Sequence, residues 1–397
     1  MPNLLYFGEV PVESSYHGSA LLYRLLANYP RGKLHIIERA ARRSKPEQRL
    51  ASVEYDSIPA DWSVGGRFLR ERAPILYWQI WRILGSLWAT RACQHVRGVG
   101  VEAVLTVCEG TLWLGARSLA KRLKVPLYLI IHDDVFRELQ GTGWLLKHLN
   151  KRFGHVYREA AGRFCISPQM ADLYERDYGA PADVLYPTRS SSAAEFDGPP
   201  QRLEQPSHPF TIAYAGTPLD GGYAEALEDV AHALLECGGR LLLFGPFTQE
   251  SVAKRGLDLP NVICRGLLPS SDLIKTFRAE ADALVVPMSF WERDRRNMTL
   301  SFPSKLTDYT CAGLPLIIYG PKYCSAAKWG RSNMGACEVI DEPSRELLVA
   351  VLQRLQKRGE AWHRMGRLAL EAGRKYFSHA VAQHVLFARL KKGCFSR

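Results

Sequence analysis

The chain has 397 residues, enough for two domains with separate cores, and its apolar and charged content is that of a globular protein. Its nine cysteines are an odd number without a Cys-x-x-Cys pair, which argues against a disulfide framework and a zinc ribbon. The formal net charge of +12 favours an anionic partner, but zinc fingers, Lys/Arg-rich runs and RNA-recognition motifs are absent, so we expect no nucleic acid.

Short apolar runs alternate with helical patterns through the first half of the chain. The predicted strands are 4–8, 34–37, 103–107, 127–134, 163–168 and 183–187, and the predicted helices are 19–26, 68–97, 111–122 and 169–178. The helical region 68–97 carries Trp78, Trp81 and Trp88 among arginines, a composition that suits a membrane interface. A largely buried core helix is the alternative interpretation.

A change of composition divides the chain. Serine and proline interrupt any periodicity between 188 and 209, which predicts a linker. The alternation then restarts, with predicted strands at 210–217, 240–245, 262–266, 283–287 and 316–318, helices at 224–237 and 271–279, and final helices from 345 onward. Strands alternating with helices twice over predict two α/β domains with parallel sheets, 1–187 and 210–375, followed by a last helix over 376–397.

The stretch 301–318 reads Ser-Phe-Pro-Ser-Lys-Leu-Thr-Asp-Tyr-Thr-Cys-Ala-Gly-Leu-Pro-Leu-Ile-Ile and predicts a loop, a short helix, a turn and a strand. Pro303 suits the first helical turn, and Ser304 is expected to cap it by accepting a backbone N–H. Gly313 can end the helix in the left-handed conformation, and Pro315 prevents its continuation.

Two side chains of this stretch have chemistry that a ligand could use. Lys305 lies at the predicted start of the helix, where unpaired N–H groups and the macrodipole also attract anions. Asp308, one turn on, could hold a ribose hydroxyl. An ordinary capped helix is the alternative interpretation.

The pattern Pro-Ser-Lys-Leu-x-(Asp/Glu)-Tyr-x-x-Ala-Gly-x-Pro resembles the donor-site helix of retaining, nucleotide-sugar-dependent glycosyltransferases of the GT-B fold, in the glycosyltransferase family 4 and glycogen-synthase-like group. The resemblance implies two Rossmann-like domains whose parallel sheets face across a cleft, with the last helix crossing back to the first domain. It implies a nucleoside diphosphate sugar as donor and no metal or other cofactor. The implied donor-binding residues are Gly216, Thr217, Arg265, Ser304, Lys305, Leu306 and Asp308.

Polar residues form the carboxyl end of the predicted strand 127–134, the end at which open α/β sheets bind ligands. His132 with Asp133 resembles the same family, in which a histidine at this point lies near the sugar. The resemblance implies His132 and Lys305 as catalytic residues and His17, Gly18 and Asp133 as acceptor-side residues. A buried histidine of the core and a plain surface loop around 17 are the alternatives.

The sequence departs from the family pattern at two places. Leu300 stands where the family often has a sugar-contacting glutamate, and the loop 216–222 lacks the arginine and lysine that often follow the first strand of the second domain. The glycines of this loop still permit close backbone approach to a phosphate. We expect Lys305 to supply the positive charge, with helpers drawn from Arg265, Arg293, Arg295 and Arg296.

We therefore interpret the chain as a glycosyltransferase that moves a sugar with retention to a saccharide or lipid-linked saccharide. A nucleotide-sugar epimerase using Glu109 or Asp134, and a non-catalytic sugar-nucleotide-binding protein, are the alternatives. The start of the chain lacks the basic stretch of a signal peptide, and no apolar run reaches the ~18 residues of a membrane span, which predicts a cytoplasmic protein. The basic segment 39–49 and the Trp-rich region 68–97 predict attachment to an anionic membrane surface, at its inner face.

Overall fold

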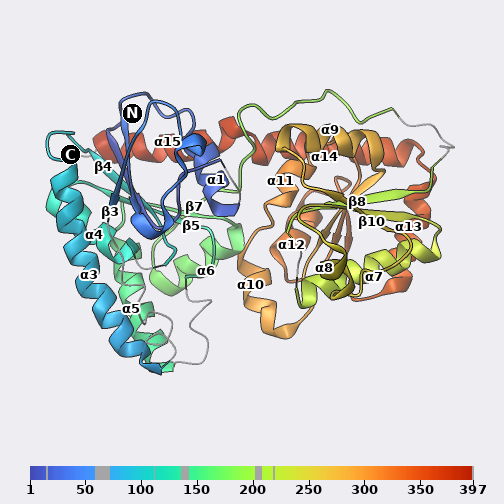
Figure 1. The fold of residues 1–397 in the computed structure, drawn as a ribbon, viewed down its shortest axis with the longest axis horizontal. Helices are drawn as coiled ribbons and strands as arrows, with labels where there is room; N and C mark the ends of the chain where they lie inside the picture. The colour runs from blue at the N-terminus through green and yellow to red at the C-terminus, as the bar shows by residue number, and fades with distance from the viewer. Residues whose placement is uncertain are drawn as a thin grey trace. The chain divides into compact units, whose positions relative to one another are not determined.

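The structure is a computed structural model that describes residues 1–14, 17–58, 72–110, 112–135, 143–201, 208–217 and 220–395. The chain forms two compact units (Figure 1). The first consists of Met1–Tyr186 with His379–Arg397, and the second of Pro187–Ser378. The chain therefore passes between the units twice.

The first unit contains a seven-stranded parallel sheet in the order β3-β2-β1-β4-β5-β6-β7. Its strands are β1 (Leu4–Gly8), β2 (Leu34–Arg39), β3 (Glu54–Ile58), β4 (Ala103–Val107), β5 (Leu127–Ile131), β6 (Gly162–Cys165) and β7 (Asp183–Val184). Its helices are α1 (His17–Leu26), α3 (Pro74–His95), α4 (Leu112–Leu123), α5 (Gly143–Glu159), α6 (Pro168–Tyr178) and α15 (His379–Phe395), with 3-10 turns η1 (Ala40–Arg42) and η2 (Pro46–Gln48).

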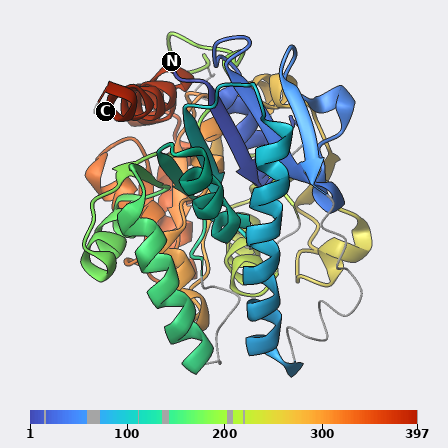
Figure 2. The ribbon, with the colours of Figure 1, turned by 90° about the vertical axis from the view of Figure 1, so that its left-hand side faces the viewer.

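Successive residues of β1 point to opposite faces of this sheet and meet different helices. Tyr6 belongs to a core that also contains residues of α1 and α15, including the fully buried Leu386 and Leu390. Phe7 faces α4, since a Cβ at Gly115 would lie 3.3 Å from Phe7 Cε1. Helices α3 and α5 lie on the α4 side, in front of the strands in Figure 2.

The second unit contains a six-stranded parallel sheet in the order β10-β9-β8-β11-β12-β13. Its strands are β8 (Thr211–Ala215), β9 (Arg240–Phe244), β10 (Val262–Gly266), β11 (Ala283–Pro287), β12 (Leu316–Tyr319) and β13 (Glu338–Ile340). Its helices are α7 (Gly222–Glu236), α8 (Gln249–Ala253), α9 (Ser270–Glu280), α10 (Arg295–Leu300), α11 (Lys305–Tyr309), α12 (Ser325–Ser332), α13 (Arg345–Gln356) and α14 (Glu360–Phe377), with the 3-10 turn η4 (Glu292–Asp294).

Alternation along the strands also builds two apolar layers in this unit. One layer contains residues of α7 and α13 packed on one face of the sheet. On the other face, Phe277 of α9 packs edge-on against Phe244 of β9 and Tyr309 of α11, with centroid distances of 5.4 and 5.6 Å. The short helix α11 is therefore anchored beneath the carboxyl end of the sheet.

The structure confirms two Rossmann-like parallel-sheet units and departs from the sequence-based expectations in detail. Helix α3 begins at Pro74, and part of the predicted helical region before it lies outside the described residues. Trp88 is buried, so the expectation of an interfacial tryptophan is wrong there, while the side chains of Trp78 and Trp81 lie outside the described ones. None of the described helices is long and apolar enough to cross a bilayer.

The termini of the second unit are also defined by contacts. Within the predicted linker, the backbone N–H of Arg189 donates to Phe377 O at 3.1 Å, and Arg278 donates to Gly198 O at 3.1 Å. Residues 187–201 therefore belong to the second unit. The last helix belongs to the first unit, where Arg389 pairs with Asp183 at 2.7 Å.

Candidate functional site

The carboxyl end of β8 is the centre of the candidate site in the second unit. The sheet grows from β8 toward β9 on one side and toward β11 on the other, which makes this a topological switch point. Helix α11 is fastened there, because the Ala215 N–H donates to Tyr309 Oη at 2.7 Å. The motif helix predicted from the sequence thus lies against the end of the central strand.

Three adjacent strands of this sheet run into glycines, which we call the glycine row: Gly216, Gly245 and Gly266. Gly216 N–H donates to Phe244 O at 2.9 Å, and Gly245 N–H donates to Gly266 O at 2.8 Å. A Cβ at Gly245 would collide with Gly216 O, so only glycine permits this backbone approach. Because glycines have no side chains, the row presents only backbone at the edge of the sheet where a ligand would bind.

Lys305 lies directly beneath the row. A Cβ at Gly216 would lie 2.7 Å from Lys305 Cε and 2.9 Å from its Nζ. The ammonium lies 5.0 Å from the centroid of the Tyr214 ring, a cation–π distance. Burial lowers the pKa of Lys305 to about 8, and no carboxylate of the described chain pairs with it. A cation held in this way lacks a counter-charge, which an anionic ligand would supply.

The other motif residues have distinct positions. The expected Ser304 cap is wrong, because Ser304 has helical backbone angles and its side chain accepts no backbone N–H. Helix α11 has only five residues, so its dipole adds little to anion binding. Leu306 is fully buried, and its N–H bonds to Pro303 O at 3.1 Å. Asp308 is half-buried, on the same turn as Lys305.

The remaining donor-side candidates have partners of their own. Arg265 precedes the last glycine of the row on the edge strand and pairs with Glu280 at 2.6 Å. Arg293 stacks on Trp291 at 3.9 Å, and Arg295 pairs with Glu292 at 3.1 Å. Thr217 is exposed, and its carbonyl accepts a hydrogen bond from Tyr214 at 3.4 Å. Among these candidates, the structure brings Gly216 and Lys305 into contact.

His132 marks the candidate site of the first unit, at the carboxyl end of β5. Its Nδ1 is shielded from solvent and has no hydrogen-bond partner among the described residues. Burial lowers the pKa of His132, against the opposing charge of Asp133, so the ring is neutral at pH 7. A Cβ at Gly18 would lie 3.8 Å from this Nδ1, so the structure brings Gly18 and His132 together.

The neighbouring acid groups differ in accessibility. Asp133 is exposed, whereas Asp134 is buried and accepts a hydrogen bond from Tyr174 at 3.0 Å. Glu109 is half-exposed and lies 3.4 Å from Arg42. The side chain of His17 lies outside the described ones. Within the described ranges, no group of three or more side chains is placed to ligate a metal ion.

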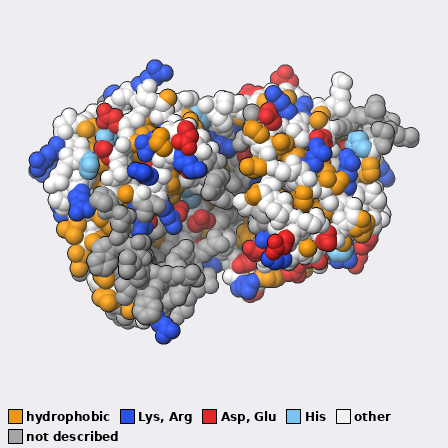
Figure 3. Space-filling model, in the orientation of Figure 1, with side chains coloured by type: hydrophobic (Ala, Val, Ile, Leu, Met, Phe, Trp, Pro, Cys, Tyr) orange, Lys and Arg blue, Asp and Glu red, His pale blue; other side chains and the backbone are white. Residues whose placement is uncertain are grey.

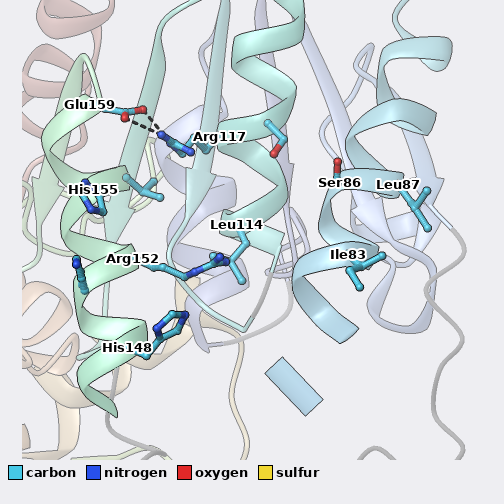
Figure 4. A pocket seen from close by; sticks show the side chains of 12 residues that line it. Ile83, Ser86, Leu87, Leu114, Arg117, His148, Arg152, His155 and Glu159 are labelled. Atoms are coloured by element: carbon cyan, nitrogen blue, oxygen red, sulfur yellow. Dashed lines mark hydrogen bonds and ion pairs between the residues drawn. The ribbon is translucent and has the colours of Figure 1, made fainter. Parts of the chain in front are cut away.

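A groove of about 970 Å³ separates α3 from α5 in the first unit, with α4 behind it (Figure 4). Ile83 and Leu87 line the α3 side and are 57% and 54% exposed. The α5 side carries basic side chains, namely His148, Lys151, Arg152 and His155. In Figure 3, orange side chains lie along α3 at the outer edge of this unit.

Acidic charge in the groove is neutralised. Glu159 lies on α5, and its carboxylate accepts hydrogen bonds from Arg117 at 2.6 Å and Lys121 at 3.1 Å. These bonds lower the pKa of Glu159 to about 2, so it remains paired and ionised at neutral pH. The groove thus has one apolar and one cationic side.

Sequence reasoning missed the residues that hold the candidate site in place. Tyr214 lies in an apolar strand, and only the fold shows that its ring contacts the Lys305 ammonium. Tyr309 lies in the motif, and only the fold shows that it bonds to the end of β8. The glycine row had a usable signal, because each predicted strand from 210, 240 and 262 runs into a glycine. The contact of Gly18 with His132 joins positions 114 residues apart (132 − 18) and had no local signal.

Comparison with solved structures identifies the fold. HepE from Anabaena in complex with UDP superposes with a TM-score of 0.67, covering 98% of this chain and 99% of that chain at 13% identity. The lipopolysaccharide outer core galactosyltransferase WaaB superposes with a TM-score of 0.61 at 16% identity, and the match covers 99% of each chain. Sucrose-phosphate synthase from Thermosynechococcus elongatus superposes with a TM-score of 0.61 at 14% identity, and this match also covers 99% of each chain.

The chain therefore has the GT-B fold of these glycosyltransferases, as the sequence motif implied. No protein family and no curated protein matches the sequence. At such low identities the likeness establishes the fold, and the function has to be argued from the site.

The burial of Lys305 yields a stability prediction. Folding disfavours the charged form of Lys305. The resulting loss of unfolding free energy is therefore complete below pH about 8, and the unfolding free energy rises with pH between about 8 and 10.5. Lys305→Met should unfold with a free energy higher by roughly 1–3 kcal/mol at pH 7, with the difference shrinking toward pH ~10. Urea unfolding at both pH values measures this.

Lys275→Met is the matched control, because Lys275 is exposed on α9 of the same unit. It should change the unfolding free energy by less than about 0.5 kcal/mol at either pH. A Lys305→Met protein that is less stable than the wild type at pH 7 would show that the ammonium stabilises the fold.

Proposed function

We propose that this chain is a nucleotide-sugar-dependent glycosyltransferase whose second unit binds the donor diphosphate at Lys305 and the glycine row. The observation that carries the proposal is a half-buried, desolvated ammonium without a carboxylate partner, in contact with Gly216 at the sheet's switch point. A diphosphate would supply the missing counter-charge, and glycine main chain permits its close approach. HepE, which shares the fold, has been solved with UDP and with UDP-glucose, so UDP is the first nucleotide to test.

The proposed chemistry is transfer of a sugar with retention of configuration, as the motif implies. The bond between the anomeric carbon and the diphosphate oxygen breaks, a bond to an acceptor hydroxyl forms, and the hydroxyl proton passes to the leaving diphosphate. Negative charge grows on that diphosphate in the transition state, and Lys305 stabilises it. We expect the ammonium and the glycine main chain to bind the diphosphate without a metal ion.

His132 is the proposed sugar-side residue of the first unit. Its shielded and unpartnered Nδ1 is an unusual feature, since buried polar atoms normally have partners. A sugar hydroxyl would complete its hydrogen bonding. The neutral ring donates from one nitrogen and accepts at the other, so it can orient a hydroxyl without a competing charge.

The proposal is tested by incubating the protein with UDP-sugars, with and without saccharide acceptors. Acceptor-dependent release of UDP supports glycosyl transfer. An isomerised UDP-sugar formed without acceptor would indicate an epimerase, whereas UDP binding without turnover would indicate a non-catalytic protein. Asp134, one carboxylate that an epimerase could use, is buried against Tyr174, and this favours transfer.

The position of Asp308 yields a binding prediction. If its carboxylate holds the ribose, Asp308→Asn should weaken binding of both uridine and UDP by about 1–3 kcal/mol. Lys305→Met should weaken UDP binding and leave uridine binding unchanged, because its partner is the diphosphate. Calorimetric titration measures both, and loss of UDP affinity alone in Asp308→Asn would contradict the ribose role.

His132 yields a kinetic prediction. His132→Ala should lower turnover by about 100-fold while UDP affinity is retained, since a positioned polar group is lost in the unit that does not bind UDP. His384→Ala, at an exposed position of α15 in the same unit, is the matched histidine control and should leave turnover unchanged. A large fall in melting temperature for His132→Ala would instead assign it to the core.

We further propose a lipid-linked acceptor, presented where the groove between α3 and α5 meets an anionic membrane surface. Leu76, Ile83 and Leu87 are exposed on one side of α3, and the basic side chains of α5 lie across the groove. Apolar side chains beside basic ones suit a lipid interface. By contrast, Arg39 pairs with Glu9 at 2.9 Å, so the segment 39–49 is partly committed to internal contacts.

Vesicle sedimentation tests this proposal. Binding should increase when phosphatidylcholine vesicles contain about 30% phosphatidylglycerol, and it should fall with salt. The double variant Ile83→Gln with Leu87→Gln, and separately Lys151→Glu, should weaken binding. Leu347→Gln, which alters a leucine that is 44% exposed on the second unit, should leave vesicle binding unchanged. Absence of binding at low salt would leave a soluble saccharide as the acceptor.

A further inference from the structure

A single buried arginine holds the motif helix α11 from behind. Arg189 is 5% exposed and follows the point where the chain enters the second unit. Its Nε donates to Thr307 O at 2.8 Å, and its Nη2 donates to Thr310 Oγ1 at 2.7 Å. Both acceptors belong to the turn that carries Lys305 and Asp308.

The short helix needs this donor. The Cys311 N–H bonds to Asp308 O at 3.0 Å, so it does not reach back to Thr307 O as the next turn of an α-helix would. Within the described chain, Thr307 O accepts instead from Arg189 and from Thr310 Oγ1 at 3.0 Å. A helix of five residues has little rigidity of its own, so the external bond fixes its position.

The charge of Arg189 is costly at this place. Burial lowers the pKa of its guanidinium, while Asp308 and Glu195 are among the groups that oppose the shift. No carboxylate of the described residues forms an ion pair with it. An apolar side chain would fill the space at lower cost, so stability alone does not account for an arginine here.

The surroundings of Arg189 are shaped to its side chain. A Cβ at Gly373 of α14 would overlap Arg189 Nη2 and would lie 2.6 Å from Thr310 Oγ1. The backbone N–H of Arg189 donates to Phe377 O, just before the chain leaves the unit after Ser378. One residue thus connects α11 with both ends of the second unit's chain.

We propose that Arg189 is a positioning residue for nucleotide binding, which holds α11 so that Lys305 and Asp308 meet the diphosphate and the ribose together. This inference rests on the proposed function, because α11 matters only if it binds the nucleotide. Arg189 acts through Thr307 and Thr310, and it touches no ligand itself. Its contribution should appear in UDP affinity beyond any effect on stability.

UDP titration calorimetry of four variants tests the inference. Arg189→Met should raise the Kd for UDP about tenfold, the effect of losing charged hydrogen bonds that hold the helix, and Arg189→Lys should give an intermediate value. Gly373→Ala should also raise the Kd, although alanine favours helices, because its Cβ displaces the guanidinium. Arg278→Met, which removes an arginine bonded to Ala312 O on the far side of the motif, should not.

Hydrogen exchange supplies a readout that a purely structural role would not move. UDP should slow exchange of the Arg189 amide in the wild type, and this slowing should be lost in Gly373→Ala. Unchanged UDP affinity in folded Arg189→Met and Gly373→Ala proteins would overturn the inference while leaving the donor site intact. A wild-type protein that binds no UDP would refute the donor assignment, and this inference with it.

Discussion

The desolvation of one ammonium group constrains the whole carboxyl edge of the second sheet. Lys305 can lie beneath β8 only because Gly216 has no side chain. Gly216 can lie there only because Gly245 also lacks a side chain, which would collide with the Gly216 carbonyl oxygen. Tyr214 supplies a ring face for the charge, and Tyr309 ties the helix to the strand end. The site thus holds a partly desolvated charge that lowers the stability of the fold, which is the usual compromise at functional sites.

Much of the fold could be predicted from the sequence because its strands are continuous apolar runs, the pattern of parallel strands buried on both faces. β1, β4 and β11 appear at the predicted bounds. The strand β3 was missed because Glu54–Ile58 is polar and lies at the sheet edge. Helix α5 was missed because its apolar residues are spaced among basic ones.

The candidate site was less predictable than the fold. Local motif chemistry indicated Lys305 and Asp308, since both stand in one recognisable stretch. The same local logic failed at Ser304, where the chain continues in helical geometry and offers no capping position. Arg189 could not be found in this way, because a lone arginine before a proline-rich segment gives no pattern, and its acceptors lie more than a hundred residues away.

The placement of α15 has a consequence for how the protein is made. The core of the first unit includes Leu386 and Leu390, which the ribosome adds only after the entire second unit. The second unit is continuous from Pro187 to Ser378 and can fold as soon as it emerges. The first unit must wait, with the part of its apolar core that α15 covers still open to water, until that helix is synthesised. The first unit is therefore expected to complete its folding after the second, although most of its residues are synthesised earlier.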